Sequence, residues 1–155
     1  MNTEQIMALC DQVREPSYAI HQYHGNGYLE KVYENALVHR LRQAGLDVKQ
    51  QHRLVIYDED GTEIDEYYAD LFIENELIVE LKACKTTTDE HISQLLHYLK
   101  GAQKEHGLLI NFGSYKFQIQ KFAKSDRAPI SSTIKKLYLF LRSLRSFAVN
   151  HQDIL

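Results

Sequence analysis

The sequence has few cysteines and no long run of apolar residues. Its two cysteines, Cys10 and Cys84, lie far apart and form no CxxC pair, which argues against a disulfide framework or a zinc site. No apolar run approaches the roughly 20 residues that a membrane-spanning helix needs, and the first residues lack the basic and then apolar layout of a signal peptide. We therefore expect a protein of the reducing cytoplasm that does not enter a membrane.

The sequence also lacks an excess of positive charge. It has 18 Lys and Arg against 21 Asp and Glu, a net charge of −3, which argues against a protein that coats DNA without specificity. A nuclease is still allowed, because carboxylates that bind metal lower the charge at the site itself. No linker rich in Pro, Gly or Ser divides the 155 residues, so we expect a single domain over residues 1–155.

Apolar periodicity and turn residues predict a mixed α/β domain. We expect a C-terminal helical extension over 128–155, and a capping box of Thr87 and Glu90 that opens the third helix. The expected elements are helices at about 3–23 and 29–41, strands at 52–57, 65–73 and 77–83, a helix after Thr87, strands at 107–112 and 115–122, and a helix at 132–150.

Two of these strands, "YYADLFI" and "LIVELKA", are joined through a turn at Asn75 and predict a β-hairpin. A register centred on Asn75 pairs Ile73 with Leu77, Phe72 with Ile78, Leu71 with Val79, Asp70 with Glu80, Ala69 with Leu81, Tyr68 with Lys82 and Tyr67 with Ala83. A slip of one residue would move the polar side chains to the core face. This register opposes two carboxylates, which repel each other, and so is a poor choice for stability.

Three interpretations of Asp70, Glu80 and Lys82 are open on spacing alone. They are a solvated sheet face with an ion pair, a structural ion pair beneath a helix, or a divalent-metal site. In the third case the carboxylate oxygens suit Mg²⁺. The lysine would then orient or deprotonate a water, or stabilise the charge that grows on a phosphate.

The surrounding motifs resemble one known family. In chain order they are "HQYHGNGYLEKVY" with His21, Gly25, Gly27, Glu30 and Tyr33, then "YYADLFI", "IVELKA", "SQLLHYLK" and "GLLINFG". Over about residues 13–115 they resemble the GxxExxY family of the PD-(D/E)XK nuclease superfamily. The resemblance implies a restriction-endonuclease-like fold, in which helices flank a central mixed β-sheet.

The resemblance also implies roles for individual residues. Glu30, Asp70, Glu80 and Lys82 would be the catalytic residues, although Ala69 stands where the superfamily has a proline. Asp70 and Glu80, with Glu30 and the backbone carbonyl of Leu81, would hold Mg²⁺ or Mn²⁺. Lys82 would assist the water that attacks the phosphodiester.

Three further residues would support the site in the same scheme. Gln94 and Tyr98 match the QxxxY element of the exonuclease-like branch, and their spacing of four places them on one side of a helix. Gln94 would reach toward the site or the DNA backbone. His21 would support the site as well.

The preferred interpretation is a metal-dependent nuclease acting on DNA, with RNA as the second choice of substrate. The alternative is a non-catalytic nucleic-acid-binding or assembly module that keeps the nuclease fold. A third candidate is an interaction protein that oligomerises through the last helix. A homodimer is expected if the domain has to grip both strands of a duplex.

Overall fold

The computed structural model describes residues 1–124 of the chain, and the expected extension over 128–155 with its helix lies outside the described residues. In the described part, the predicted order of helices and strands is confirmed. The elements are α1 (Thr3–His24), α2 (Glu30–Gln43), β1 (Val48–Tyr57), β2 (Glu63–Ile73), β3 (Leu77–Lys82), α3 (Asp89–Gly101), β4 (His106–Asn111) and β5 (Gln118–Ala123).

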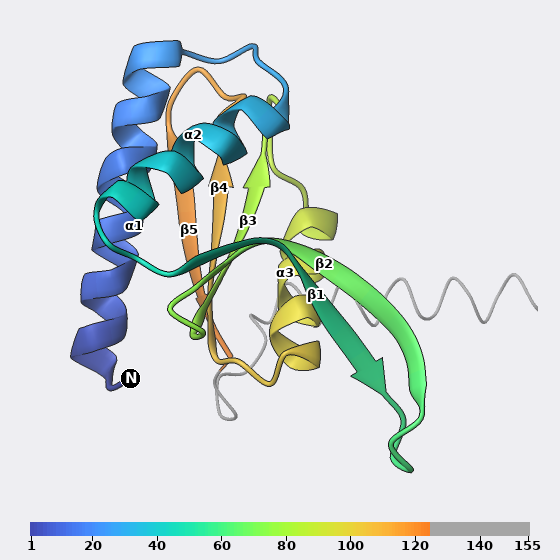
Figure 1. Ribbon diagram of the computed structural model, residues 1–155. Coiled ribbons are helices and arrows are strands. Elements are labelled where there is room, and N and C mark those ends of the chain that lie inside the picture. The colour runs from blue at the N-terminus through green and yellow to red at the C-terminus, as the bar shows by residue number, and fades with distance from the viewer. Residues whose placement is uncertain (125–155) are drawn as a thin grey trace, which may run out of the picture. The chain divides into compact units, whose positions relative to one another are not determined.

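The five strands form one mixed sheet in the order β1-β2-β3-β4-β5. Only β3 and β4 are parallel, and α3 is the crossover between them. The buried side chains of α1 and α2 cluster on one face of the sheet, and those of α3 on the other. Figure 1 shows these layers, and it shows β1 and β2 as a long curved hairpin that reaches beyond the other strands.

Among the helices of residues 1–124, we find none with the length and apolar character that crossing a membrane requires.

The helix ends follow local sequence signals. Helix α2 ends at its C-cap Ala44, and Gly45 follows with a φ of +85°. There the Gly45 amide donates to the Arg42 carbonyl and the Leu46 amide to that of Leu41, at 2.9 and 3.1 Å, as in a Schellman motif. The start of α3 was predicted one residue too early: Thr88 is the N-cap, and its amide donates to Nδ1 of His91 at 3.2 Å. The histidine takes the place that the prediction assigned to Glu90.

Strand β1 begins at Val48, four residues before the predicted start at residue 52. The run "KQQ" is polar and looks like a loop in the sequence. It nevertheless belongs to the strand, because Val48 pairs with Ile73 and Gln50 with Leu71 of the long strand β2. Tertiary pairing thus overrides the local pattern.

The predicted hairpin register is right near the turn and wrong beyond it. Leu71 pairs with Val79, and the next two pairs toward the turn are also as predicted, but the ladder ends there. The four outer pairs, Asp70–Glu80, Ala69–Leu81, Tyr68–Lys82 and Tyr67–Ala83, are not formed. In their place β2 continues beside β1, and β3 continues beside β4 as far as Lys82. The two strands therefore separate where the acidic residues lie.

The end of β3 is held against the end of β4 by buried polar contacts. The amide of Phe112 donates to the carbonyl of Lys82 at 2.7 Å. The side chain of Asn111, which is fully buried, accepts from the amides of Cys84 and Gly113 at 3.1 and 3.0 Å. These contacts position the backbone that carries Lys82.

We predict that Gly113→Ala destabilises the domain strongly. A Cβ at Gly113 would lie only 2.2 Å from the backbone nitrogen of Cys84 and 2.3 Å from the carbonyl carbon of Ala83. Because these are backbone atoms that cannot rotate away, we expect a loss at or above the upper end of the roughly 1–3 kcal/mol typical of overpacking. Urea denaturation measures it.

Gly61→Ala is the matched control. Its added Cβ meets no atom, and only its positive φ of +86° is unfavourable, so we expect a loss of about 1 kcal/mol. Equal losses for the two variants would contradict the close approach at Gly113.

Candidate active site

The acidic site lies where β2 and β3 part. There the carboxylate of Asp70 replaces a strand as the hydrogen-bond acceptor: its Oδ2 accepts from the amide of Leu81 at 2.8 Å. Its Oδ1 accepts from Nε2 of Gln51 at 3.1 Å. Burial raises the pKa of Asp70 above its usual value, although both hydrogen bonds act in the opposite direction. The side chain is thus buried and oriented at both oxygens.

Glu80 is the most deeply buried acid of the site, with 2% of its surface exposed. Its Oε1 accepts from Nζ of Lys82 at 2.8 Å, whereas its Oε2 is buried and has no hydrogen-bond partner. Burial, and then the negative charge of Asp70, raise the pKa of Glu80 to about 7. A buried carboxylate oxygen without a partner is costly, so this atom is an unsatisfied acceptor within the site.

Lys82 carries the positive charge of the site. Burial lowers the pKa of Lys82, but the hydrogen bond to Glu80 and the charges of Glu80, Glu30 and Asp70 outweigh burial and raise it overall. The side chain is therefore a protonated donor at neutral pH.

Glu30 lies in the first turn of α2 and is within electrostatic range of this cluster. Burial raises its pKa, the charge of Lys82 lowers it, and the charges of Asp70 and Glu34 raise it. The structure thus brings together the four residues expected to be catalytic.

Gln94 and Tyr98 lie together on α3, with Nε2 of Gln94 donating to the Tyr98 hydroxyl at 2.8 Å. Burial raises the pKa of Tyr98, and the charges of Glu80 and Asp70 add to this effect. This coupling places the tyrosine hydroxyl near the carboxylates, on the α3 side of the sheet.

His21 lies elsewhere, at the C-terminal part of α1. Its Nε2 is 2.8 Å from the carbonyl oxygen of Ser114, and its ring packs at 5.8 Å from that of Phe117. Its contacts are thus with the loop between β4 and β5. Any support of the site by His21 would act through that loop.

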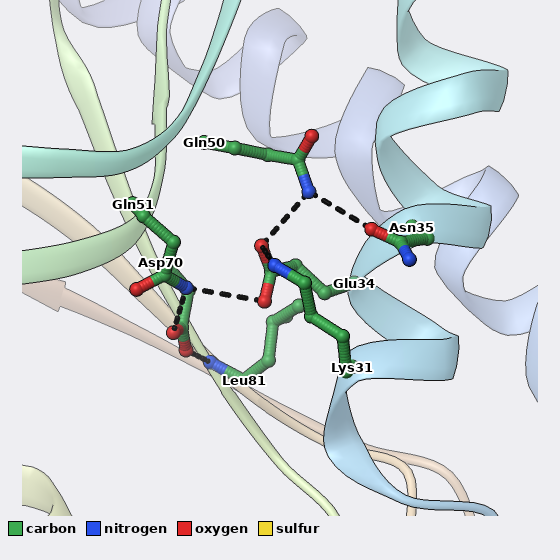
Figure 2. A network of polar contacts seen from close by, with 7 residues as sticks. All are labelled: Lys31, Glu34, Asn35, Gln50, Gln51, Asp70 and Leu81. Carbon is green, nitrogen blue, oxygen red and sulfur yellow. Dashed lines mark hydrogen bonds and ion pairs between the residues drawn. The ribbon is translucent and has the colours of Figure 1, made fainter.

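Glu34, which the sequence motifs did not indicate, is the centre of a polar network (Figure 2). Glu34 is 3% exposed. Its Oε1 accepts from Lys31 and Gln50 at 2.8 and 2.9 Å, and its Oε2 from Gln51 at 3.1 Å. One signal in the sequence was available: Glu34 follows Glu30 by four residues, so two acids share one helix face beside the apolar stripe.

The donor set suits a hard divalent ion. Asp70, Glu80 and the Leu81 carbonyl offer oxygen ligands, which Mg²⁺ and Mn²⁺ prefer, and the unpartnered Oε2 of Glu80 is the atom that an ion would satisfy. In residues 1–124, however, no three His, Cys, Asp or Glu side chains are grouped so that they could hold a metal together. The residues thus fit an ion held by two carboxylates and a carbonyl.

A mixed sheet flanked by helices, with acidic residues and a lysine at the point where two strands part, is the restriction-endonuclease-like architecture. A sequence model of the PD-(D/E)XK nuclease superfamily matches residues 7–122. The chain belongs to this superfamily, whose members are nucleases that bind nucleic acids and generally use divalent metal ions.

The crystal structure of SSO0001 has a similar fold. It superposes with a TM-score of 0.53 over 86% of this chain and 70% of that chain, at 19% sequence identity. At this identity the likeness concerns the fold alone. Among curated proteins, no match was found.

We predict that the contribution of Glu80 to the stability of the metal-free protein falls between about pH 4.5 and 7. The pKa of Glu80 is about 7 in the folded state against an ordinary value of 4.5, so the folded state holds a proton that the unfolded state releases in this window. The sign is therefore a loss with rising pH, of up to roughly 3 kcal/mol from this group. The raised pKa of Lys82 changes the free energy of unfolding only near and above pH 10, which lies outside this window.

Glu80→Gln tests the assignment by urea denaturation in EDTA. Its free energy of unfolding should rise relative to wild type as pH rises from 4.5 to 8, because the glutamine does not ionise. A difference that stays constant across this range would contradict a raised pKa at Glu80.

Proposed function

We propose that the domain is a metal-dependent nuclease that hydrolyses phosphodiester bonds in DNA through Asp70, Glu80 and Lys82. The observation that carries the proposal is the buried Oε2 of Glu80, which has no partner and lies beside a second buried carboxylate. A site built only for stability would satisfy this atom, since leaving it unpaired costs free energy. RNA is the second choice of substrate.

In this proposal Asp70, Glu80 and the Leu81 carbonyl hold the ion, and Glu30, which the family resemblance also implies as a ligand, approaches from the first turn of α2. A bound Mg²⁺ or Mn²⁺ would lower the pKa of a water and neutralise phosphate charge. Lys82 contributes a donor and a positive charge. Because its pKa is raised, it suits the orientation of the water or the stabilisation of the phosphate better than the removal of a proton.

The same proposal includes the narrower family, the role of Gln94 and the cellular location. The motifs around Gly25, Gly27, Glu30 and Tyr33 support membership in the GxxExxY family. Gln94, bonded to Tyr98 near the carboxylates, supports a contact with the site or the nucleic-acid backbone. We also propose a cytoplasmic location, because Cys10 and Cys84 are both free.

One observation favours the alternative of a non-catalytic nucleic-acid-binding module. As described above, residues 1–124 contain no ready group of three metal-binding side chains. In a decayed site the pair of Lys82 and Glu80 would serve as a structural ion pair. Metal titration separates the two functions.

We predict that the wild-type protein binds Mn²⁺ and Mg²⁺ by calorimetry and cleaves DNA. Glu80→Ala should lose both, because the ion loses a ligand. Lys82→Ala should bind Mn²⁺ equally or more tightly, since a competing positive charge is removed, while cleavage falls by about 10²–10³-fold because one stabilising donor is lost. The matched control is Lys85→Ala, an exposed lysine just beyond the site, which should keep both properties.

If the wild type binds neither ion at millimolar concentration and leaves both DNA and RNA intact, the nuclease proposal is wrong and the site is structural. The binding module then becomes the function, and retention of DNA by the wild type would support it.

We propose a homodimer as the form that acts on a duplex, because one small domain has to reach two strands. Light scattering at micromolar concentration should give twice the monomer mass for the protein alone, and the mass of two protomers plus the duplex when DNA is bound. A monomer under both conditions would contradict the dimer and leave the nuclease proposal in place.

A further inference from the structure

Two consecutive glutamines of β1 donate to the same buried carboxylate. Neighbouring side chains of a regular strand point to opposite faces of the sheet. Gln50 and Gln51 nevertheless both reach Glu34, through Oε1 at 2.9 Å and Oε2 at 3.1 Å (Figure 2). The strand must therefore be irregular at this point.

The irregularity lies in the backbone of Gln51, whose φ of +47° is in the left-handed region. Gln50 pairs with Leu71 and His52 with Ala69, but Gln51 and Asp70, which lie between them, are missing from the ladder. A non-glycine residue keeps this conformation only where its surroundings hold it, and such residues gather at functional sites.

The side chain of Gln51 is held by two acids. Its Nε2 donates to Oε2 of Glu34 and to Oδ1 of Asp70, each at 3.1 Å. Both amide hydrogens are thus used, and the amide cannot flip, because its oxygen would then face two carboxylates. Glu34 also accepts from Lys31 and Gln50, neither of which hydrogen-bonds to Asp70.

The consequence is an Asp70 carboxylate restrained at both oxygens, by Gln51 on one and by the Leu81 amide on the other. Each carboxylate oxygen can accept more than one interaction, so Asp70 keeps capacity for an ion. Its orientation is set before the ion arrives.

We propose that Gln51, oriented by Glu34, is a positioning residue that holds Asp70 ready to bind the divalent ion. This inference rests on the proposed function, since it requires that Asp70 is a ligand. Partners of metal ligands fix the ligand's orientation, and their loss typically costs about 10–100-fold in metal affinity.

Gln51→Met and Gln50→Met form a matched pair for the test. Methionine has a similar length and no amide donor, and each variant removes one hydrogen bond to Glu34. Only Gln51→Met also removes a hydrogen bond to Asp70. We expect Gln51→Met to weaken Mn²⁺ binding by about tenfold or more, whereas Gln50→Met keeps the wild-type affinity within about a factor of two.

The readouts are the Mn²⁺ dissociation constant by calorimetry and the unfolding temperature in EDTA. A merely structural role would lower both unfolding temperatures and shift both affinities alike. Adding Glu34→Gln to Gln51→Met should weaken Mn²⁺ binding no further than about threefold, because Glu34 acts through Gln51. A larger further loss would overturn the role given to Glu34.

The outcomes separate this inference from the proposed function. If the wild type binds Mn²⁺ and Gln51→Met binds it equally well, or Gln50→Met loses as much, the positioning role is overturned and the nuclease proposal stands. If the wild type binds no Mn²⁺, the proposed function fails and the inference fails with it.

Discussion

Asp70 accepts a hydrogen bond from the backbone amide of Leu81 at 2.8 Å, at the place where β2 leaves β3. A buried amide at a parting of strands needs an acceptor, and the carboxylate supplies it. The same bond turns Asp70 toward β3 and brings it next to Glu80 and Lys82. Without it, the separation of the strands would leave a buried amide unpaired, and the acids would not share one site. The geometry of the site therefore depends on this contact.

The concentration of charge at this point opposes folding. Burial raises the pKa of Glu30, Asp70 and Glu80, and the acids also raise one another's pKa. Lys82 is the positive charge that interacts with all three acids. Of the three, Glu80 is the one that accepts a hydrogen bond from it. A fully satisfied polar network can rigidify a core, whereas a partly satisfied one is costly. The network around Glu34 is of the first kind and the Glu80–Lys82 pair is of the second, so a hydrogen-bonded frame lies beside a pair that keeps one unsatisfied carboxylate oxygen.

Much of this arrangement could be predicted from the sequence, because short-range patterns determine it. The turn at Asn75 and the alternation beside it correctly predicted the hairpin pairs nearest the turn. The spacing of four between Gln94 and Tyr98 correctly placed both side chains together on one helix. The frame around Asp70 could not be predicted in this way. Nothing in the run "KQQ" indicates that a non-glycine residue, Gln51, takes a left-handed conformation, or that two successive side chains share a face.

The sequence by itself determined the order of the elements up to β5 and the superfamily. These follow from periodicity, turn chemistry and local motifs, which involve residues close together in the chain. Only the tertiary structure decided where β2 leaves β3, that Glu34 joins Gln51 and Asp70, and that Oε2 of Glu80 is buried without a partner. The physical reason is that hydrogen-bond satisfaction and desolvation depend on every group that surrounds an atom. Those groups come from α2, β1, β2 and β3, which lie together only after the chain has folded.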